Sequence, residues 1–230
     1  MNSRDTDAFV AADRLGKHYD GASALDGVTF RVPRGRVVGL LGRNGSGKTT
    51  LLRALQGLVV PTSGACSVFG IASTSLGDAE LARIGVVHQE NRFLPWMSGR
   101  AHLDYVHSFF ERWDSKREAQ LVAALDLDLS ERIGAMSPGA VQKLAIVTAT
   151  SHRPDVLLLD ETAAALDPLA REVLLRALLD ILREDEPAIL ISSHALRDVE
   201  RTVDWILCLE RGRVVQDEAF DTLQAESATV

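Results

Sequence analysis

A glycine-rich stretch at residues 42–50 holds the side chains best suited to bind phosphate. It fits the pattern G-x-x-x-x-G-K-T of a phosphate-binding loop, between an apolar run and a helical pattern. Glycines let backbone N–H groups point at one anion, and the following helix adds its partial positive charge. Lys48 can reach the β- and γ-phosphates of a nucleotide, and the Thr49 hydroxyl can ligate Mg²⁺. A glycine-rich turn with a surface lysine is the alternative. The loop consists of Gly42, Arg43, Asn44, Gly45, Ser46, Gly47, Lys48, Thr49 and Thr50.

Acidic and imidazole side chains follow two later apolar runs. Residues 156–159 lead into Asp160 and Glu161, and residues 188–193 lead into His194. Ligand sites of parallel sheets lie at the carboxyl ends of the strands, so we expect these side chains at one edge. Asp160 can hold Mg²⁺, and Glu161 can take a proton from an attacking water. His194 is a candidate contact to the γ-phosphate.

Two residues are weaker candidates when only their neighbours are considered. Tyr19 lies in a predicted loop over 16–23, where it can stack on a base or be an ordinary half-exposed tyrosine. Gln89 follows a strand predicted over 84–88. It can orient water or contact a metal, although its neighbours alone favour an ordinary polar loop residue.

The segment 136–144 predicts a helix N-terminus. Ser137 suits the capping position, and Pro138 suits the first helical position. Gly139 would then let an anion approach its backbone N–H. A well-capped helix without a ligand explains the same residues.

Hydrophobic periodicity predicts the elements that position these groups. Buried strands alternate with helical patterns, which is typical of an α/β fold with a mostly parallel sheet, and N-terminal antiparallel strands precede it. Strands are predicted at 9–15, 24–32, 37–41, 65–69, 84–88, 156–159 and 188–193, with a final hairpin at 205–215. Asp167 and Pro168 predict the start of a helix with an apolar stripe.

Between residues 91 and 153 the pattern becomes helical, and aromatic residues cluster there. We expect one domain over 1–230, with a nucleotide-binding core at 1–90 and 154–230 and an inserted subdomain of three or four helices at 91–153. Leu94-Pro95-Trp96-Met97 reads as an apolar loop and a candidate partner contact. Most of the other aromatic residues are expected in the subdomain core: Phe93, Tyr105, Phe109, Phe110 and Trp113.

Composition limits the classes of partner. The chain has 230 residues, 46% of them hydrophobic, and a net charge of −7, which argues against nucleic acid as a partner. Cys66 and Cys208 predict two buried thiols in a reducing compartment. Neither a signal peptide nor a membrane-spanning run is recognisable, so a soluble, cytoplasmic protein is expected.

With all these pieces in order, the chain resembles the ATP-binding subunit of an ABC transporter over nearly its whole length. Residues 42–49 match the P-loop of that family. The further matches are Tyr19 to the adenine-stacking aromatic, Gln89 to the Q-loop glutamine, Asp160 to the Walker B aspartate, Glu161 to the catalytic glutamate, Asp167 to the D-loop aspartate and His194 to the switch histidine.

Two segments depart from the family pattern. The signature Leu-Ser-Gly-Gly-Gln is replaced by residues 136–140, in which Ser137 and Gly139 survive but the glutamine is Ala140. The Ser137 hydroxyl and the N–H groups of Gly139 and Ala140 are expected to remain available to a phosphate. The D-loop, Pro-Thr-Ser-Gly-Leu-Asp in the family, reads Thr-Ala-Ala-Ala-Leu-Asp over 162–167, which lacks polar groups used between the two sites of a dimer.

The resemblance implies an ATPase that dimerises head to tail around two ATP molecules, as a homodimer or a heterodimer. It implies a separate multi-span membrane permease as partner, a peripheral position on the cytoplasmic side of the cell membrane, and, from residues 96–98 and 109–114, an export-type transporter. Glu161 would act as base together with Lys48, Gln89 and His194. Thr49, Gln89 and Asp160 would hold Mg²⁺. The alternatives are a soluble ABC ATPase of the cluster-assembly type and a non-hydrolysing nucleotide-binding regulator.

Overall fold

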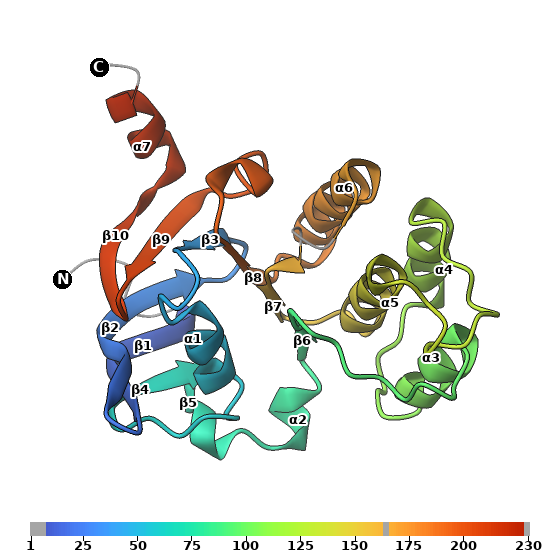
Figure 1. The fold of residues 1–230 in the computed structure, drawn as a ribbon, viewed down its shortest axis with the longest axis horizontal. Coiled ribbons are helices and arrows are strands. Elements are labelled where there is room, and N and C mark those ends of the chain that lie inside the picture. The colour runs from blue at the N-terminus through green and yellow to red at the C-terminus, as the bar shows by residue number, and fades with distance from the viewer. Residues whose placement is uncertain (1–7, 163–165, 228–230) are drawn as a thin grey trace.

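The computed structural model describes residues 8–162 and 166–227. Two sheets and the helices around them build the fold (Figure 1). The smaller sheet is antiparallel, in the order β2-β1-β4-β5. Its strands are β1 (Ala8–Tyr19), β2 (Ala22–Pro33), β4 (Ser63–Val68) and β5 (Ile71–Ala72).

The larger sheet has the order β10-β9-β3-β8-β7-β6 and is parallel except for the edge strand β10. Its strands are β3 (Val37–Leu41), β6 (Ile84–Val87), β7 (Val156–Asp160), β8 (Ala188–Ser193), β9 (Trp205–Glu210) and β10 (Arg213–Ala219). The phosphate loop therefore follows β3, and the acidic pair Asp160 and Glu161 lies at the end of β7. These two strands lie on either side of β8 in the parallel part of the sheet. The predicted α/β fold with antiparallel N-terminal strands is confirmed.

Helices connect these strands. They are α1 (Lys48–Leu55), α2 (Asp78–Leu81), α3 (Gly99–His107), α4 (Ser115–Ala124), α5 (Pro138–Ser151), α6 (Pro168–Asp185) and α7 (Phe220–Ser227), with short 3₁₀ turns at Ser73–Ser75 and Leu196–Asp198. Helix α5 packs against β6, and α3 and α4 pack against α5 on its side away from the sheet (Figure 1). None of the helices in the described ranges is long and apolar enough to cross a bilayer.

Helix α6 begins where its local sequence predicts. The Asp167 carboxylate accepts a hydrogen bond from the N–H of Ala170 at 2.9 Å, and Pro168 occupies the first turn, where its missing N–H costs nothing. Leu174, Leu178 and Ile181 form the buried stripe of the helix.

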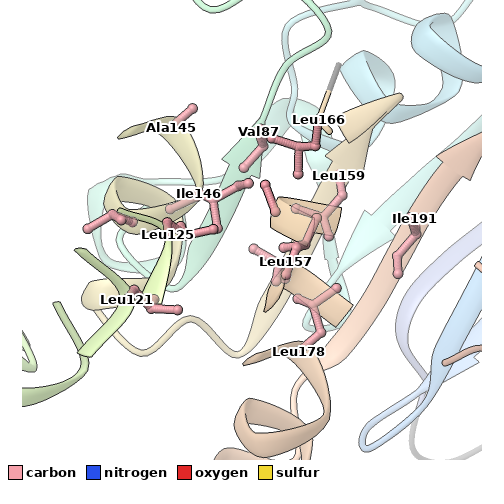
Figure 2. Close-up of a cluster of buried hydrophobic side chains, with 14 of the residues drawn as sticks. Val87, Leu121, Leu125, Ala145, Ile146, Leu157, Leu159, Leu166, Leu178 and Ile191 are labelled. Atoms are coloured by element: carbon pink, nitrogen blue, oxygen red, sulfur yellow. The ribbon is translucent and has the colours of Figure 1, made fainter. Parts of the chain in front are cut away.

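The central strands are buried on both faces, so alternate residues enter two different cores. Leu158 and Leu190 face the core shared with α1 and the antiparallel sheet. Leu157, Leu159 and Ile191 face the core formed with α5 and α6 (Figure 2). Fully buried strands explain the uninterrupted apolar runs in the sequence. Truncating Leu157 to alanine should cost about 2–5 kcal/mol of stability.

Two sequence interpretations were wrong in detail. The predicted loop over 16–23 is instead the end of a β1–β2 hairpin, because pairing continues to Tyr19 and Ala22 across a turn at Asp20–Gly21. Cys208 is only partly buried.

The aromatic residues between 91 and 153 divide into two groups. Phe93 and Trp113 pack against the core, as predicted. Tyr105 and Phe109 are 51% and 64% exposed and contact each other edge to face, so they lie outside it. Phe109 follows the end of α3, where its position is no longer governed by the apolar stripe of that helix.

Candidate active site

The phosphate loop takes a conformation that its glycines make possible. Gly47, which precedes α1, has φ +109°, in the region that favours glycine. A Cβ there would lie 2.5 Å from the carbonyl oxygen of Ala24, and one at Gly42 would lie 2.5 Å from that of Leu209. The first N–H groups of a helix have no partner inside it, so the N-terminus of α1 presents donors to the loop.

A cavity of about 470 Å³ opens over this loop. Tyr19 lines it together with Gln89 and Glu161, which come from distant segments. The Ser46 hydroxyl is buried and has no hydrogen-bond partner within the described chain. An unpaired donor, a cationic lysine and a helix N-terminus together suit a polyphosphate. The remaining lining residues are Ala24, Asn44, Gly45, Ser46, Gly47, Lys48, Thr49 and Thr50.

Lys48 is held at the floor of the loop by three oxygen atoms. Its Nζ donates to the carbonyl of Gly42 at 2.6 Å and to that of Arg43 at 3.4 Å. The same Nζ lies 3.1 Å from Oε1 of Glu161, and both side chains are buried. Arg43 and Gly42 therefore contact Lys48 through their carbonyls. They do not line the cavity.

Glu161 joins Lys48 to His194. Nδ1 of His194 donates to Oε2 of Glu161 at 2.9 Å, so both carboxylate oxygens face a cation or a donor. Burial by itself would raise the pKa of Glu161, but His194 and Lys48 together hold that pKa below its ordinary value. Glu161 is therefore ionised at neutral pH, as a proton acceptor must be.

Asp160 lies in a neighbouring cavity of about 780 Å³, which shares Thr49 and Gln89 with the first. The carboxylate of Asp160 is buried, and its Oδ1 accepts a hydrogen bond from the Ser192 hydroxyl at 2.7 Å. One carboxylate and one hydroxyl fit Mg²⁺, which prefers a few hard oxygen ligands and completes its shell with water and phosphate. The described residues contain no group of three or more His, Cys, Asp or Glu that could hold a metal alone.

Two predicted site residues, Ser137 and Gly139, lie apart from the cavity over the phosphate loop. Ser137 caps α5 as predicted, with its Oγ accepting from the N–H of Ala140 at 3.1 Å. That bond occupies an N–H expected to be available to a phosphate, so the expectation for Ala140 was wrong. Neither Ser137 nor Gly139 lines the cavity over the phosphate loop. Ala163, Ala164 and Ala165 of the D-loop lie outside the described residues.

The family model described as "ABC transporter" matches residues 25–164, which cover the phosphate loop, the acidic pair and the helices between them. The chain belongs to this family. It is an ATP-binding subunit that hydrolyses ATP, and the sequence-based prediction of an ABC ATPase is confirmed.

Known relatives agree on the family and differ in the direction of transport. A Nod factor export ATP-binding protein I from Paraburkholderia xenovorans is 30% identical, over 95% of this chain and 73% of that protein. An aliphatic sulfonates import ATP-binding protein from Nocardia farcinica is 35% identical, over 92% of this chain and 82% of the other. The solved ATP-binding subunit of an ABC transporter superposes with a TM-score of 0.86 at 27% identity, over 96% of this chain and 93% of that chain.

Two polar residues near the site of this ABC ATPase, Ser192 and Asn91, cannot be recognised from the sequence. Ser192 bonds to Asp160 as described. Asn91 accepts from the N–H of His88 and donates to Gln142 of α5 at 2.7 Å, which links the segment after Gln89 to the signature helix. Both residues look like ordinary polar residues in sequence, because their partners are 32 and 51 positions away.

Proposed function

We propose that this ABC ATPase binds ATP with Mg²⁺, dimerises on it and powers a separate membrane permease, in the direction of export. The observation that carries the proposal is the convergence of Lys48, Glu161 and His194 beside a cavity lined by the phosphate loop. Three chain segments far apart in sequence supply one cation, one base and one imidazole at the same place.

In the proposed reaction, the γ-phosphate takes the place of Glu161 as the anionic partner of Lys48. Glu161 is then released to accept the proton of a water attacking in line, and His194 and Lys48 stabilise the charge that develops on the phosphate oxygens. Thr49, Gln89 and Asp160 would hold Mg²⁺, which neutralises charge on the phosphates when bound. Tyr19, 44% exposed at the rim, would stack on the base.

The proposed dimer is head to tail. Ser137 and Gly139 start α5 outside the chain's own cavity, so they are available to the ATP bound by a partner subunit. A helix N-terminus that begins with a serine and a glycine suits a γ-phosphate. We further propose that helices 91–153 form a subdomain that moves when the dimer closes.

Exposed apolar side chains support a protein partner near the second cavity. Trp96 is 68% exposed and Leu58 66%, and Leu58 lines that cavity together with Arg53 and Phe93. A permease docked there would place the chain peripherally on the cytoplasmic side of the membrane. Co-purification with a multi-span membrane protein supports this partner, whereas co-purification with soluble proteins alone supports a cluster-assembly ATPase. ATP-driven uptake into inverted vesicles distinguishes export from import.

Substitution of Lys48 tests nucleotide binding. Lys48→Ala removes the cation that faces the cavity, so ATP should bind weakly. ATP at 100 times the wild-type Kd should no longer raise stability by about 2.7 kcal/mol. Lys116→Ala, an exposed position on α4, is the matched control. Binding of MgATP by Lys48→Ala with wild-type affinity would refute the proposed site.

A further inference from the structure

One buried hydroxyl contacts both acidic residues of the site. Ser192 is the penultimate residue of β8, is 1% exposed and pairs with Asp160 across the parallel strands β7 and β8. Its Oγ donates to Oδ1 of Asp160 at 2.7 Å and accepts the N–H of Glu161 at 2.9 Å. A single side chain therefore connects the proposed metal ligand to the backbone of the proposed base.

The directions of these two bonds follow from the donors available. A serine hydroxyl has one proton and can also accept, whereas an amide N–H can only donate. Ser192 must accept from Glu161, so its own proton goes to Asp160. Asp160 is held as an acceptor through Oδ1, and this bond fixes the rotation of the carboxylate. Its other oxygen, Oδ2, is thereby left for a cation in the cavity shared with Thr49.

The second bond supports an unusual backbone conformation. Glu161 has φ +50°, which costs a non-glycine residue about 1–3 kcal/mol unless its surroundings hold it. β7 ends at Asp160, and the Ser192 hydroxyl then supplies an acceptor for the next N–H, that of Glu161. This left-handed turn directs the Glu161 side chain to Lys48 and His194.

We propose that Ser192 is a positioning residue that orients Asp160 toward Mg²⁺ and holds the backbone of Glu161 in its turned conformation. The inference rests on the proposed Mg²⁺-dependent hydrolysis of ATP. A residue that only stabilises the fold would behave differently. Ser151 provides that comparison, because it is completely buried and its Oγ donates only to the carbonyl of Val147, at 2.7 Å, within α5.

The test compares Ser192→Ala with Ser151→Ala in the full chain. For each variant we would measure Tm, kcat, the Mg²⁺ concentration that gives half-maximal rate, and the Kd for ATP with Mg²⁺ and with EDTA. Ser192→Ala should raise the half-maximal Mg²⁺ concentration by about 10- to 100-fold and lower kcat. It should bind ATP in EDTA within about twofold of wild type but lose the tightening that Mg²⁺ produces. Ser151→Ala should lower Tm but leave the half-maximal Mg²⁺ concentration unchanged.

Two further variants keep the inference falsifiable. Ser192→Cys preserves the size of the side chain but replaces a strong donor with a weak one, so it should fold and change the Mg²⁺ dependence in the same direction. Ser192→Thr retains the hydroxyl, so its half-maximal Mg²⁺ concentration should be that of wild type. Wild-type Mg²⁺ dependence in both Ser192→Ala and Ser192→Cys would overturn the inference, as would wild-type behaviour of Ser192→Cys if Ser192→Ala does not fold. Failure of the wild-type chain to need Mg²⁺ would instead overturn the proposed function.

Discussion

Glu161→Gln should tighten ATP binding while it stops turnover. In the structure, the carboxylate of Glu161 is the only acidic group of the described chain within ion-pair distance of Lys48, at 3.1 Å. The amide of glutamine keeps the shape but loses the charge. Lys48 is then left with the carbonyl oxygens of Gly42 and Arg43 until a nucleotide arrives.

The magnitude follows from the burial of this pair. Removing one partner of a buried ion pair costs about 3–5 kcal/mol, and the two carbonyl acceptors of Lys48 should reduce that cost to about 2 kcal/mol. The γ-phosphate supplies a new anionic partner for Lys48. The free energy lost with Glu161 is therefore recovered when ATP binds, and the binding free energy becomes more favourable by the same amount. At 1.4 kcal/mol for each factor of ten, the Kd for ATP should fall by about 30-fold. Turnover should fall by about 10²- to 10⁴-fold because the base is lost.

The assay is ATP binding by calorimetry, with Tm measured in the presence and absence of MgATP. The variant should have a lower Tm than wild type without nucleotide, a larger rise with ATP, and an ATP-held dimer on a sizing column. Glu200→Gln, an exposed substitution of the same kind, should change none of these. An unchanged Kd and Tm would refute the role of the ion pair, and turnover near the wild-type rate would show that another residue is the base.

Three other predictions concern the dimer, the permease and acid stability. Gly139→Glu should abolish ATP-driven dimerisation but leave ATP binding to the monomer intact, whereas Ala140→Gln should preserve or raise turnover. A homodimer of Gly139→Glu that hydrolyses ATP at the wild-type rate would show that the N-terminus of α5 does not contact nucleotide.

Trp96→Ala should weaken association with the permease in a pull-down and spare the ATPase activity of the isolated subunit. Unfolding of that variant would make Trp96 structural. Burial against Phe110 lowers the pKa of His152 to about 4. The unfolded chain therefore takes up this proton first, and stability should fall by about 1.4 kcal/mol for each pH unit between pH 6.5 and about 4. Urea titrations should show a shallower slope for His152→Gln, and an unchanged slope would contradict this assignment.

Much of this protein could be predicted from local patterns in the sequence. The phosphate loop is a contiguous stretch whose glycines and Lys48 act within a few residues, so spacing alone identifies it. The caps at Ser137 and Asp167 are equally local, because a side chain there bonds to an N–H three residues later. Uninterrupted apolar runs predicted the central strands, since strands buried on both faces need no alternation.

Other features depend on neighbours that are distant in sequence. Residues 109 and 113 are both aromatic, yet Phe109 is exposed and Trp113 packs on the core, because burial is decided by what folds over each of them. Tyr19 reads as a loop residue, but its pairing with Ala22 follows from the register of a whole hairpin. Periodicity within one segment contains no information on such partners.

The arrangement of the site was decided by tertiary structure. The neighbouring residues Asp160 and Glu161 predict two carboxylates at a strand end. Because Glu161 has a left-handed backbone conformation, the two side chains contact different partners. Ser192 is an ordinary strand residue in sequence and becomes part of the site only when β8 pairs with β7. Local spacing thus determined which chemical groups the chain carries. Strand pairing and backbone conformation decided which atoms meet, because both depend on contacts between residues far apart in the chain.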